Sequence, residues 1–294
     1  MIKIMTTKIS YLGPKGTYTE EPALVLQRKT GGFLSPELTA TLVAKKVASG
    51  ESDLGVLAYY NLLEGLVQEN LDLIYENNLY IIDITRVPIV HSAGVYKESN
   101  ENNFVYSHPK ALAQCSDWIT KNQLKCEETA STAKAAEKVN ELKCGIAIAK
   151  KSALEKNELE IIAEDIGNIT TKGKNYTDMY IVSKKRDEKY LHGIKYSTMI
   201  AITPHTNEAG LLARKILMPI YWDGVNVEKI HSRPSLADIT SSNCESQMFY
   251  LELNGHIQDK NLIEAVSKIK RNLKPNKADI EIVRILGSYK KPSI

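Results

Sequence analysis

Short apolar runs alternate along the chain with longer segments in which apolar residues recur every three or four positions. Buried strands are predicted at residues 8–12, 54–59, 104–106, 145–148 and 177–183. Helices are predicted at residues 20–28, 64–76, from Pro109 onward, and at 131–142. This alternation predicts βαβ units and a mostly parallel sheet, which binds ligands beyond the carboxyl ends of its strands.

A change in composition divides the chain at residues 184–189, where the sequence KKRDEK forms a charged stretch that we interpret as a linker. After it, the apolar pattern predicts a strand, a helix, two strands, a helix and a strand. These elements are expected at residues 198–203, 209–220, 225–231, 248–253, 262–273 and 279–286. Their order is that of a split βαββαβ unit, so the predicted fold class is α/β with a second, smaller α/β domain.

Composition narrows the possible partners. The 294-residue chain is 43% hydrophobic and 25% charged, so it can bury a large core and suits about two domains. Its net charge of +3, from 38 basic and 35 acidic residues, predicts no general attraction to nucleic acid or to a membrane surface. The four cysteines form no CxxC pair and the amino terminus has no secretory pattern, so we expect reduced thiols in a cytoplasmic protein.

Three loops that follow predicted strands place hydroxyl groups at the start of a helix. The amides and the dipole of a helix start favour an anion, so the three loops together predict a cleft for a small anionic molecule. The alternative is that each hydroxyl only caps its own helix. The candidates are Gly16, Thr17 and Thr19 in the first loop, Ser107 and Gln114 in the second, and Ser131 and Thr132 in the third.

The chain resembles the prephenate dehydratase family. The residues that carry the resemblance are, in order, YLGPKGTYTE, GVLAYYNLLEG, SHPKALAQC, TASTAKAAEKV and NYTDM. The C-terminal part resembles the family's ACT regulatory domain. There, Ala209-Gly210-Leu211-Leu212 stands in place of a PGAL-type stretch and His231-Ser232-Arg233-Pro234 in place of ESRP.

This resemblance implies a catalytic domain over residues 1–186, with two lobes like those of periplasmic binding proteins, and a ferredoxin-like ACT domain over residues 195–290. Prephenate is the implied substrate, which loses carbon dioxide and water to become phenylpyruvate. No cofactor is implied, and the six histidines show no metal-binding spacing. Phenylalanine is the implied allosteric ligand, and a homodimer or homotetramer is expected.

The family motifs also imply roles for single residues. Thr177 matches the catalytic threonine, which we expect to donate a hydrogen bond to the departing ring hydroxyl. Asn61, Glu64 and Tyr60 complete the predicted catalytic set. The hydroxyls and glycine of the three loops, with Gln114 and Asp178, are the predicted substrate-binding residues. The two C-terminal stretches, 209–212 and 231–234, are the predicted amino-acid site.

Two positions depart from the polar pattern of the family. Tyr60 stands where the family has Glu, and Asp178 where it has Arg, so the two changes together resemble the removal of an ion pair. If Asp178 faced the substrate, each unit of charge would change a solvated contact at about 4 Å by roughly 1 kcal/mol. The alternatives are that Asp178 points away and pairs with Lys172 or Lys174, and that Tyr60 is a core aromatic residue beside Tyr59.

These departures leave three functional hypotheses. The leading hypothesis is a feedback-regulated prephenate dehydratase of phenylalanine biosynthesis. The second is a non-aromatising prephenate decarboxylase, which releases carbon dioxide but keeps the ring hydroxyl. The third is a sensor of aromatic amino acids whose catalytic half has decayed and which acts only through its ACT domain.

We predict that inhibition by phenylalanine is weaker than is usual in the family, or that the site is tuned to another amino acid; the alternative is that His231 only ends a strand at the surface. His231 replaces the family's Glu, and an imidazole is a poor partner for the ammonium group of an amino acid. Thermal unfolding measured with each ligand checks this prediction. The shift with phenylalanine should be smaller than the shift with prephenate, and an equally large shift would contradict it.

Overall fold

The computed structural model describes residues 7–99, 102–168, 174–187, 189–204, 210–234, 247–273 and 282–292. The chain forms two compact units. The larger unit comprises Met1–Leu73 and Thr85–Ile181, and the smaller comprises Ile74–Ile84 and Val182–Ile294. The domain boundaries expected from the sequence, 1–186 and 195–290, stay predictions, although the second boundary between the units falls only a few residues before the charged stretch.

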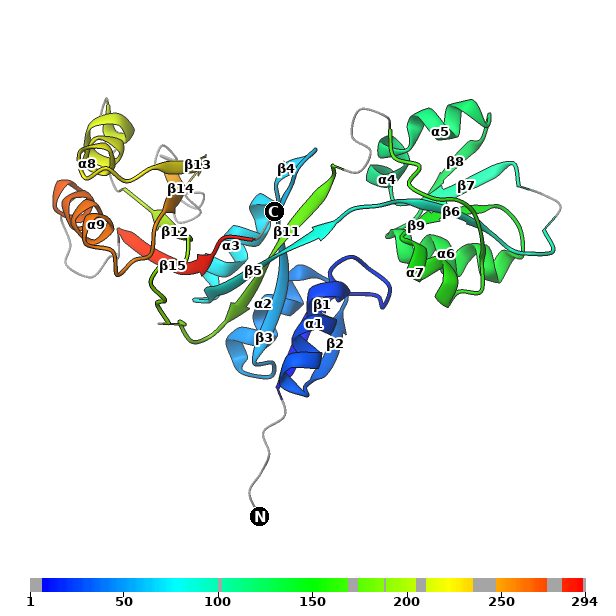
Figure 1. Cartoon of the computed structure of the whole chain (residues 1–294), viewed down its shortest axis with the longest axis horizontal. Coiled ribbons are helices and arrows are strands. Elements are labelled where there is room, and N and C mark those ends of the chain that lie inside the picture. Colours follow the sequence, from blue (N-terminus) through cyan, green and yellow to red (C-terminus); the bar gives the residue numbers. More distant parts are fainter. Residues whose placement is uncertain are drawn as a thin grey trace, which may run out of the picture. The chain divides into compact units, whose positions relative to one another are not determined.

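Two sheets form the larger unit, and the first sheet with its helices is called the first lobe here (Figure 1). The parts of this lobe within residues 74–84 and 182–183 are counted in the smaller unit. Its elements are β1 (Lys8–Leu12), α1 (Glu20–Thr30), β2 (Phe33–Glu37), α2 (Ala40–Ser49), β3 (Leu54–Asn61), β4 (Gly65–Leu66), α3 (Gln68–Glu76), β5 (Tyr80–Pro88) and β11 (Tyr176–Ser183). The strand order is β2-β1-β3-β11-β5, with β4 paired to β3. Strand β1, between β2 and β3, is parallel to both, as the alternating pattern predicts.

The second lobe is built on the other sheet of this unit. Its elements are β6 (Ser92–Val95), β7 (Phe104–Ser107), α4 (Pro109–Gln114), α5 (Ser116–Lys121), β8 (Lys125–Glu128), α6 (Thr132–Leu142), β9 (Ile146–Ala149), α7 (Lys151–Lys156) and β10 (Glu160–Ala163). The order is β10-β6-β9-β7-β8. β7 is parallel to β8 and β9, but β6 is antiparallel to β9 and β10. The expectation of a mostly parallel sheet is therefore wrong for this lobe, because β6 enters from the first lobe and runs against both of its neighbours.

The chain passes between the lobes twice, once from β5 to β6 and once from β10 to β11. The two crossing segments are hydrogen-bonded to each other, since the amide of Ile89 donates to the carbonyl of Asn175 at 2.9 Å. His91, on the first crossing, accepts a hydrogen bond from the amide of Ile166 at 2.9 Å. Residues on these crossings are therefore held at the place where the two lobes join.

The predicted helix at residues 64–76 begins later in the structure, at Gln68. The carboxamide oxygen of Asn61 accepts hydrogen bonds from the amides of Leu63 and Glu64, at 3.0 and 3.2 Å, which folds this segment into a turn. Gly65 then adopts φ 83°, a left-handed conformation that other residues rarely take. Glu64 consequently lies in a turn and not in a helix.

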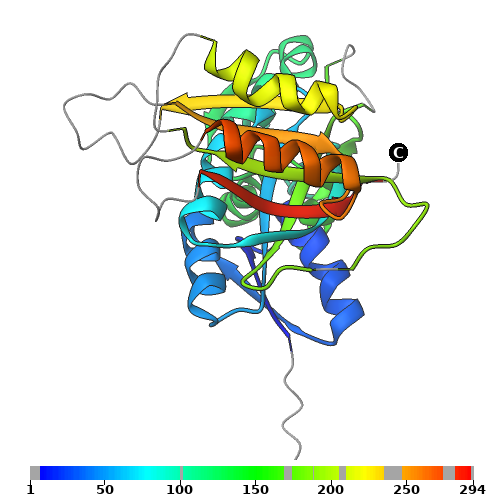
Figure 2. The ribbon, with the colours of Figure 1, turned by 90° about the vertical axis from the view of Figure 1, so that its left-hand side faces the viewer.

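The smaller unit contains a four-stranded antiparallel sheet with the order β13-β14-β12-β15. Its elements are β12 (Tyr196–Ile202), the π-helix η1 (Leu211–Leu217), α8 (Met218–Trp222), β13 (Val227–Pro234), β14 (Gln247–Asn254), α9 (Lys260–Asn272) and β15 (Val283–Lys290). Figure 2 shows the helical segment 211–222 and α9 on the same face of this sheet. The predicted βαββαβ order and ferredoxin-like fold class are confirmed.

One predicted helix of this unit is irregular. The segment expected as a helix at 209–220 is a π-helix over Leu211–Leu217 followed by the short helix α8. Pro219 stands in the first turn of α8 and has no amide hydrogen to donate to the preceding turn. The wider π turn accommodates this missing donor.

Arg284 of β15 fixes the connection between α3 and β5 within the smaller unit. Its guanidinium donates to the carbonyl of Tyr75 and to Oδ1 of Asn78, both at 2.7 Å, and to the carbonyl of Leu79 at 3.4 Å. The side chain is buried. Arg284 thereby binds one carbonyl in the last turn of α3 and two acceptors in the segment that follows the helix.

In the described ranges, no helix is long and apolar enough to cross a membrane. Cys115, Cys126 and Cys144 are free thiols, and Cys244 lies outside the described residues.

Candidate active site

A cavity of about 710 Å³ lies in the larger unit and is lined by both of its lobes. Its lining residues are Leu12, Gly13, Pro14, Thr17, Tyr18, Thr19, Pro36, Glu37, Leu38, Ala58, Asn61, Glu64, Val67, Ile89, His91, His108, Lys110, Ala111, Gln114, Ala130, Ser131, Thr132, Lys134, Thr177 and Met179. The mixture of apolar surface with a few polar groups is typical of a site for a small ligand.

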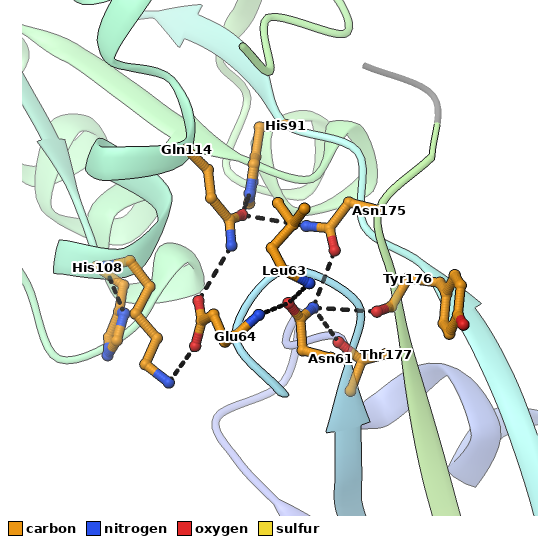
Figure 3. A network of polar contacts seen from close by, with 10 residues as sticks. Asn61, Leu63, Glu64, His91, His108, Gln114, Asn175, Tyr176 and Thr177 are labelled. Atoms are coloured by element: carbon orange, nitrogen blue, oxygen red, sulfur yellow. Dashed lines mark hydrogen bonds and ion pairs between the residues drawn. The ribbon is translucent and has the colours of Figure 1, made fainter. Parts of the chain in front are cut away.

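Asn61 orients Thr177 in this cavity (Figure 3). The amide nitrogen Nδ2 of Asn61 donates to the Thr177 hydroxyl oxygen at 2.9 Å and to the Tyr176 carbonyl at 3.0 Å. The opposite side of the same carboxamide accepts from the amides of Leu63 and Glu64, so backbone atoms on both sides fix which end is nitrogen. Thr177 accepts this bond, and its own hydroxyl proton is left for a group in the cavity.

A chain of hydrogen bonds continues from Asn61 to the second lobe. Nδ2 of Asn61 donates to Oδ1 of Asn175 at 3.0 Å, and Nδ2 of Asn175 donates to Oε1 of Gln114 at 3.3 Å. Gln114 in turn donates through Nε2 to Oε1 of Glu64 at 3.1 Å, and Lys110 forms an ion pair with Oε2 of the same carboxylate. Glu64 belongs to the first lobe and Gln114 and Lys110 to α4, so this chain joins the two lobes across the cavity (Figure 3).

Two histidines of the cavity are neutral at pH 7. Burial lowers the pKa of His91 below its ordinary value, although its hydrogen bond to Gln114 acts in the opposite direction. Because Oε1 of Gln114 can only accept, the His91 nitrogen 2.8 Å away, Nε2, carries the proton. Burial and the charge of Lys110 lower the pKa of His108, whose Nδ1 accepts from the Lys110 amide at 3.3 Å and caps α4.

Donor groups of the glycine loop at residues 13–19 form hydrogen bonds within the protein, so they are not available to a ligand. The amide of Gly16 donates to Glu20 at 2.6 Å, and Gly16 does not line the cavity. The Thr17 hydroxyl lies 3.0 Å from the Leu12 and Pro14 carbonyls, and the Thr19 hydroxyl donates to Leu12 at 2.5 Å. The amide of Gly16 and these two hydroxyls already have internal partners, which corrects the expected anion-binding role of Gly16, and Thr19 also makes no side-chain cap on α1.

The other two helix starts differ from each other. Ser131 caps α6 by accepting from the Lys134 amide at 3.1 Å, as the capping alternative predicts, and both Ser131 and Thr132 line the cavity. Ser107 is buried and donates to the Ile148 carbonyl at 2.6 Å, so it neither caps α4 nor reaches the cavity. The expected substrate contact of Ser107 is therefore corrected, because its only proton is used inside the sheet.

Asp178 lies outside the cavity. Its two carboxylate oxygens accept from Nε and Nη2 of Arg86, at 2.8 and 3.0 Å, and its side chain is 5% exposed. The guanidinium also stacks 3.7 Å from the centre of the Tyr176 ring. The alternative in which Asp178 points away from the substrate is the one that the structure favours, with Arg86 as its partner; Lys172 lies outside the described residues.

Tyr60 is also absent from the cavity lining. It lies on β3 beside the buried Tyr59, with ring centres 6.3 Å apart, and Tyr59 stacks on Tyr180 at 4.2 Å. This position agrees with the alternative in which Tyr60 is an aromatic residue beside Tyr59, and its expected catalytic role stays a prediction.

Several residues of the site were not predicted from the sequence. His91, His108, Lys110 and Lys134 line the cavity, and Asn175 belongs to its hydrogen-bond chain. Asn175 and His91 lie on the two crossing segments, where no periodic pattern marks them. Lys110 and Lys134 follow the predicted helix starts by a few residues, so helical geometry at those starts could have indicated them. In the described part of the chain, no cluster of His, Cys, Asp and Glu could hold a metal ion.

The predicted amino-acid site lies in the smaller unit. Gly210 precedes the π-helix in a left-handed conformation, and Leu211 and Leu212 begin that helix. His231, Ser232, Arg233 and Pro234 form the end of β13, and Ala209 lies outside the described residues. Burial and the charge of Lys229 lower the pKa of His231, and its Nε2 has no hydrogen-bond partner among the residues described.

The fold and the cavity define a two-lobed α/β protein whose largely apolar cavity carries a few polar groups, joined to a ferredoxin-like unit. The family model described as prephenate dehydratase matches residues 9–187. The bifunctional chorismate mutase/prephenate dehydratase of Aquifex aeolicus (strain VF5) is 33% identical over 287 residues, covering 97% of this chain and 74% of that protein. The chain belongs to the prephenate dehydratase family.

Two solved structures resemble the whole chain. Prephenate dehydratase from Arthrobacter aurescens, in complex with L-Phe, is 25% identical with a TM-score of 0.82, covering 97% of this chain and 90% of that chain. GqqA, described as a novel type of quorum quenching acylase, is 25% identical with a TM-score of 0.80, covering 96% of this chain and 97% of that chain. Both similarities extend over the two lobes and the C-terminal unit.

Replacing Asp178 with Asn should lower the free energy of unfolding by about 2 kcal/mol, because it leaves the partly buried guanidinium of Arg86 without its counter-charge. Adding Arg86→Met to Asp178→Asn should recover part of this loss. Denaturant unfolding of the two single variants and the double variant measures the coupling. As a control, Lys151→Gln breaks an exposed ion pair with Glu164 and should change stability by less than about 0.5 kcal/mol. Simple additivity of the two single effects would contradict the ion pair.

Stability should also fall below pH 6.5 in a way that depends on His91. In the unfolded chain, His91 is protonated below its ordinary pKa of 6.5. In the folded protein, burial lowers this pKa, so the side chain stays neutral to a lower pH. This stabilisation is complete above pH 6.5 and is lost as the pH falls toward the lower pKa of the folded state. In His91→Gln, the difference in unfolding free energy between pH 7.5 and pH 5.5 should be smaller than in the wild type. The exposed His192→Gln serves as the control, and an equal pH dependence in wild type and His91→Gln would show that the prediction is wrong.

Proposed function

We propose that the chain is a prephenate dehydratase, a lyase that decarboxylates and dehydrates prephenate to phenylpyruvate in phenylalanine biosynthesis. The observation that carries this proposal is the Thr177 hydroxyl, which lines the cavity and is oriented by an Asn61 carboxamide whose direction is fixed by backbone atoms. The relative from Aquifex aeolicus and the structure from Arthrobacter aurescens carry this activity in their names.

In the proposed reaction, Thr177 assists the departure of the ring hydroxyl. The ring carboxylate leaves as carbon dioxide, and the electron pair of its bond enters the ring and expels the hydroxyl, which takes one proton and leaves as water. The ring becomes aromatic. Hydroxide is a poor leaving group, so a hydrogen bond donated to its oxygen lowers the barrier. Asn61 occupies the acceptor side of Thr177, which leaves the donor side for the substrate.

The position of Asp178 supports dehydration over decarboxylation alone. The non-aromatising hypothesis rests on the departures at Tyr60 and Asp178, the second of which places a negative charge beside Thr177. In the structure that charge is neutralised by Arg86 and is not part of the cavity lining. The predicted catalytic residues that do line the cavity, Asn61, Glu64 and Thr177, are linked through the polar network, which also argues against a decayed catalytic half.

The resemblance to GqqA does not support an acylase here. Acyl transfer by a threonine needs a base that takes the hydroxyl proton. The partner of the Thr177 hydroxyl is the amide nitrogen of Asn61, which donates and cannot accept a proton. The same geometry suits a threonine that acts as a hydrogen-bond donor.

Regulation by phenylalanine follows from the C-terminal unit and from the relative that binds L-Phe. The predicted weaker response fits a His231 that is neutral at pH 7, because a neutral imidazole offers no charge to an ammonium group. A homodimer or homotetramer and a cytoplasmic location stay predictions, and so does the absence of a cofactor.

The product formed from prephenate tests the proposal. Mass spectrometry should show loss of both carbon dioxide and water, and Thr177→Val should reduce kcat by about 10²–10³ because it removes the donor from the leaving group. Thr30→Val, which removes a hydroxyl outside the cavity, should leave kcat unchanged. A wild-type product that retains the hydroxyl would establish the decarboxylase, and no turnover together with phenylalanine binding would establish the sensor.

A further inference from the structure

A dianionic substrate needs positive charge that position 178 does not supply. Prephenate carries two carboxylates, one on the ring and one on the pyruvyl side chain. The family's arginine is Asp178 in this chain, and Asp178 is engaged with Arg86 away from the cavity. The counter-charges must therefore come from other elements of the chain.

Within the lining of the cavity, two side chains carry a full positive charge, and both belong to the second lobe. Lys110 stands in the first turn of α4 and Lys134 in the first turn of α6. The histidines of the lining, His91 and His108, are neutral at pH 7 because burial lowers the pKa of each. The two lysines are thus the cationic groups that the described lining offers to an anion.

The opposite wall carries a negative charge. Burial acts to raise the pKa of Glu37, but its hydrogen bonds with Lys46 and Ser35 lower that pKa overall, so the carboxylate is ionised. Glu37 lies in the first lobe at the end of β2. This carboxylate is paired with Lys46 at 2.8 Å, and the first lobe contributes no cationic side chain to the described lining, so a dianion in the cavity can find positive side chains only on the second lobe.

Each lysine remains available to a ligand. The Lys110 side chain is 63% exposed and forms an ion pair with Glu64. Its ammonium group has three N–H donors, so it can contact a second carboxylate as well. Lys134 pairs with Glu137 one turn along α6, and its side chain is 53% exposed, so this ion pair is weak. The hydrogen bond to Glu137 also raises the pKa of Lys134, which keeps it charged.

We propose that Lys110 and Lys134 bind the two carboxylates of the substrate and so replace the arginine that is absent at position 178. This assignment rests on the proposed function. The carboxylates would lie against the helix starts of the second lobe, and the ring hydroxyl would face Thr177. Lys110 would then also link substrate binding to the contact between the lobes, because its present partner Glu64 belongs to the first lobe.

Steady-state kinetics on Lys110→Gln and Lys134→Gln test this assignment. Each variant should raise KM for prephenate by about tenfold or more, the effect expected for loss of one charged hydrogen bond, with kcat changed by less than about threefold. Lys110→Arg and Lys134→Arg should restore most of the affinity. Lys151→Gln removes the same charge outside the cavity and should change KM by less than about twofold.

Inhibition by phenylpyruvate adds a sharper readout. This product keeps only the side-chain carboxylate, so one of the two Gln variants should weaken its inhibition by about tenfold and the other should not. Prephenate binding by calorimetry should weaken in both variants, and this measurement does not depend on turnover.

An unchanged KM and Kd for prephenate in both Gln variants would overturn the assignment, and so would a loss confined to kcat. If wild type binds prephenate without turning it over, the proposed reaction fails while the lysine assignment is still judged by the variants' Kd. If wild type neither binds nor converts prephenate, both proposals fail.

Discussion

The carboxamide of Asn61 is the interaction on which the site depends. Its oxygen accepts two backbone amides and shapes the turn at residues 62–64, while its nitrogen contacts Asn175, Tyr176 and Thr177. The Asn61 side chain thereby sets the position of Glu64 and the orientation of the Thr177 hydroxyl. It also makes the first hydrogen bond of the chain that leads to the second lobe. A carboxylate of the same shape could not substitute, because it has no donor for the Tyr176 carbonyl. A buried polar network of this kind is rigid only when every member is satisfied.

The same network determines how charge is distributed in the cavity. Its donors run in one direction, from Asn61 through Asn175 and Gln114 to the carboxylate of Glu64, where Lys110 supplies the counter-charge. The carboxylate of Asp178 does not belong to this network and is paired with Arg86 instead. The negative charge beside Thr177 is thus compensated by Arg86 on the neighbouring strand β5 and lies outside the cavity lining.

The C-terminal unit is connected to the site through the chain itself. Residues 74–84 belong to that unit, yet they are preceded by Glu64 and Val67 and followed by Arg86, Ile89 and His91. Arg284 fixes the turn in this segment by three hydrogen bonds. The segment is therefore held by the regulatory fold and continues directly into strands and crossings that carry cavity residues.

The sequence by itself determined the buried parallel strands, the βαββαβ order and the family motifs, because these depend on local apolar periodicity and on short contiguous stretches. It missed β2, β5, β8 and β10, the four edge strands of the two sheets in the larger unit, because edge strands have one solvated side and carry fewer apolar residues. It also missed the two-residue strand β4 and the interior strand β6, which is buried but only four residues long. It identified Thr177, Asn61, Glu64 and Gln114 but could not separate them from Tyr60, Ser107 and Asp178. Only the tertiary structure decided which of these side chains reach the cavity and which residue pairs with Asp178. Such contacts join residues far apart in the chain, and a local sequence pattern does not show which residue will lie beside a given side chain in the fold.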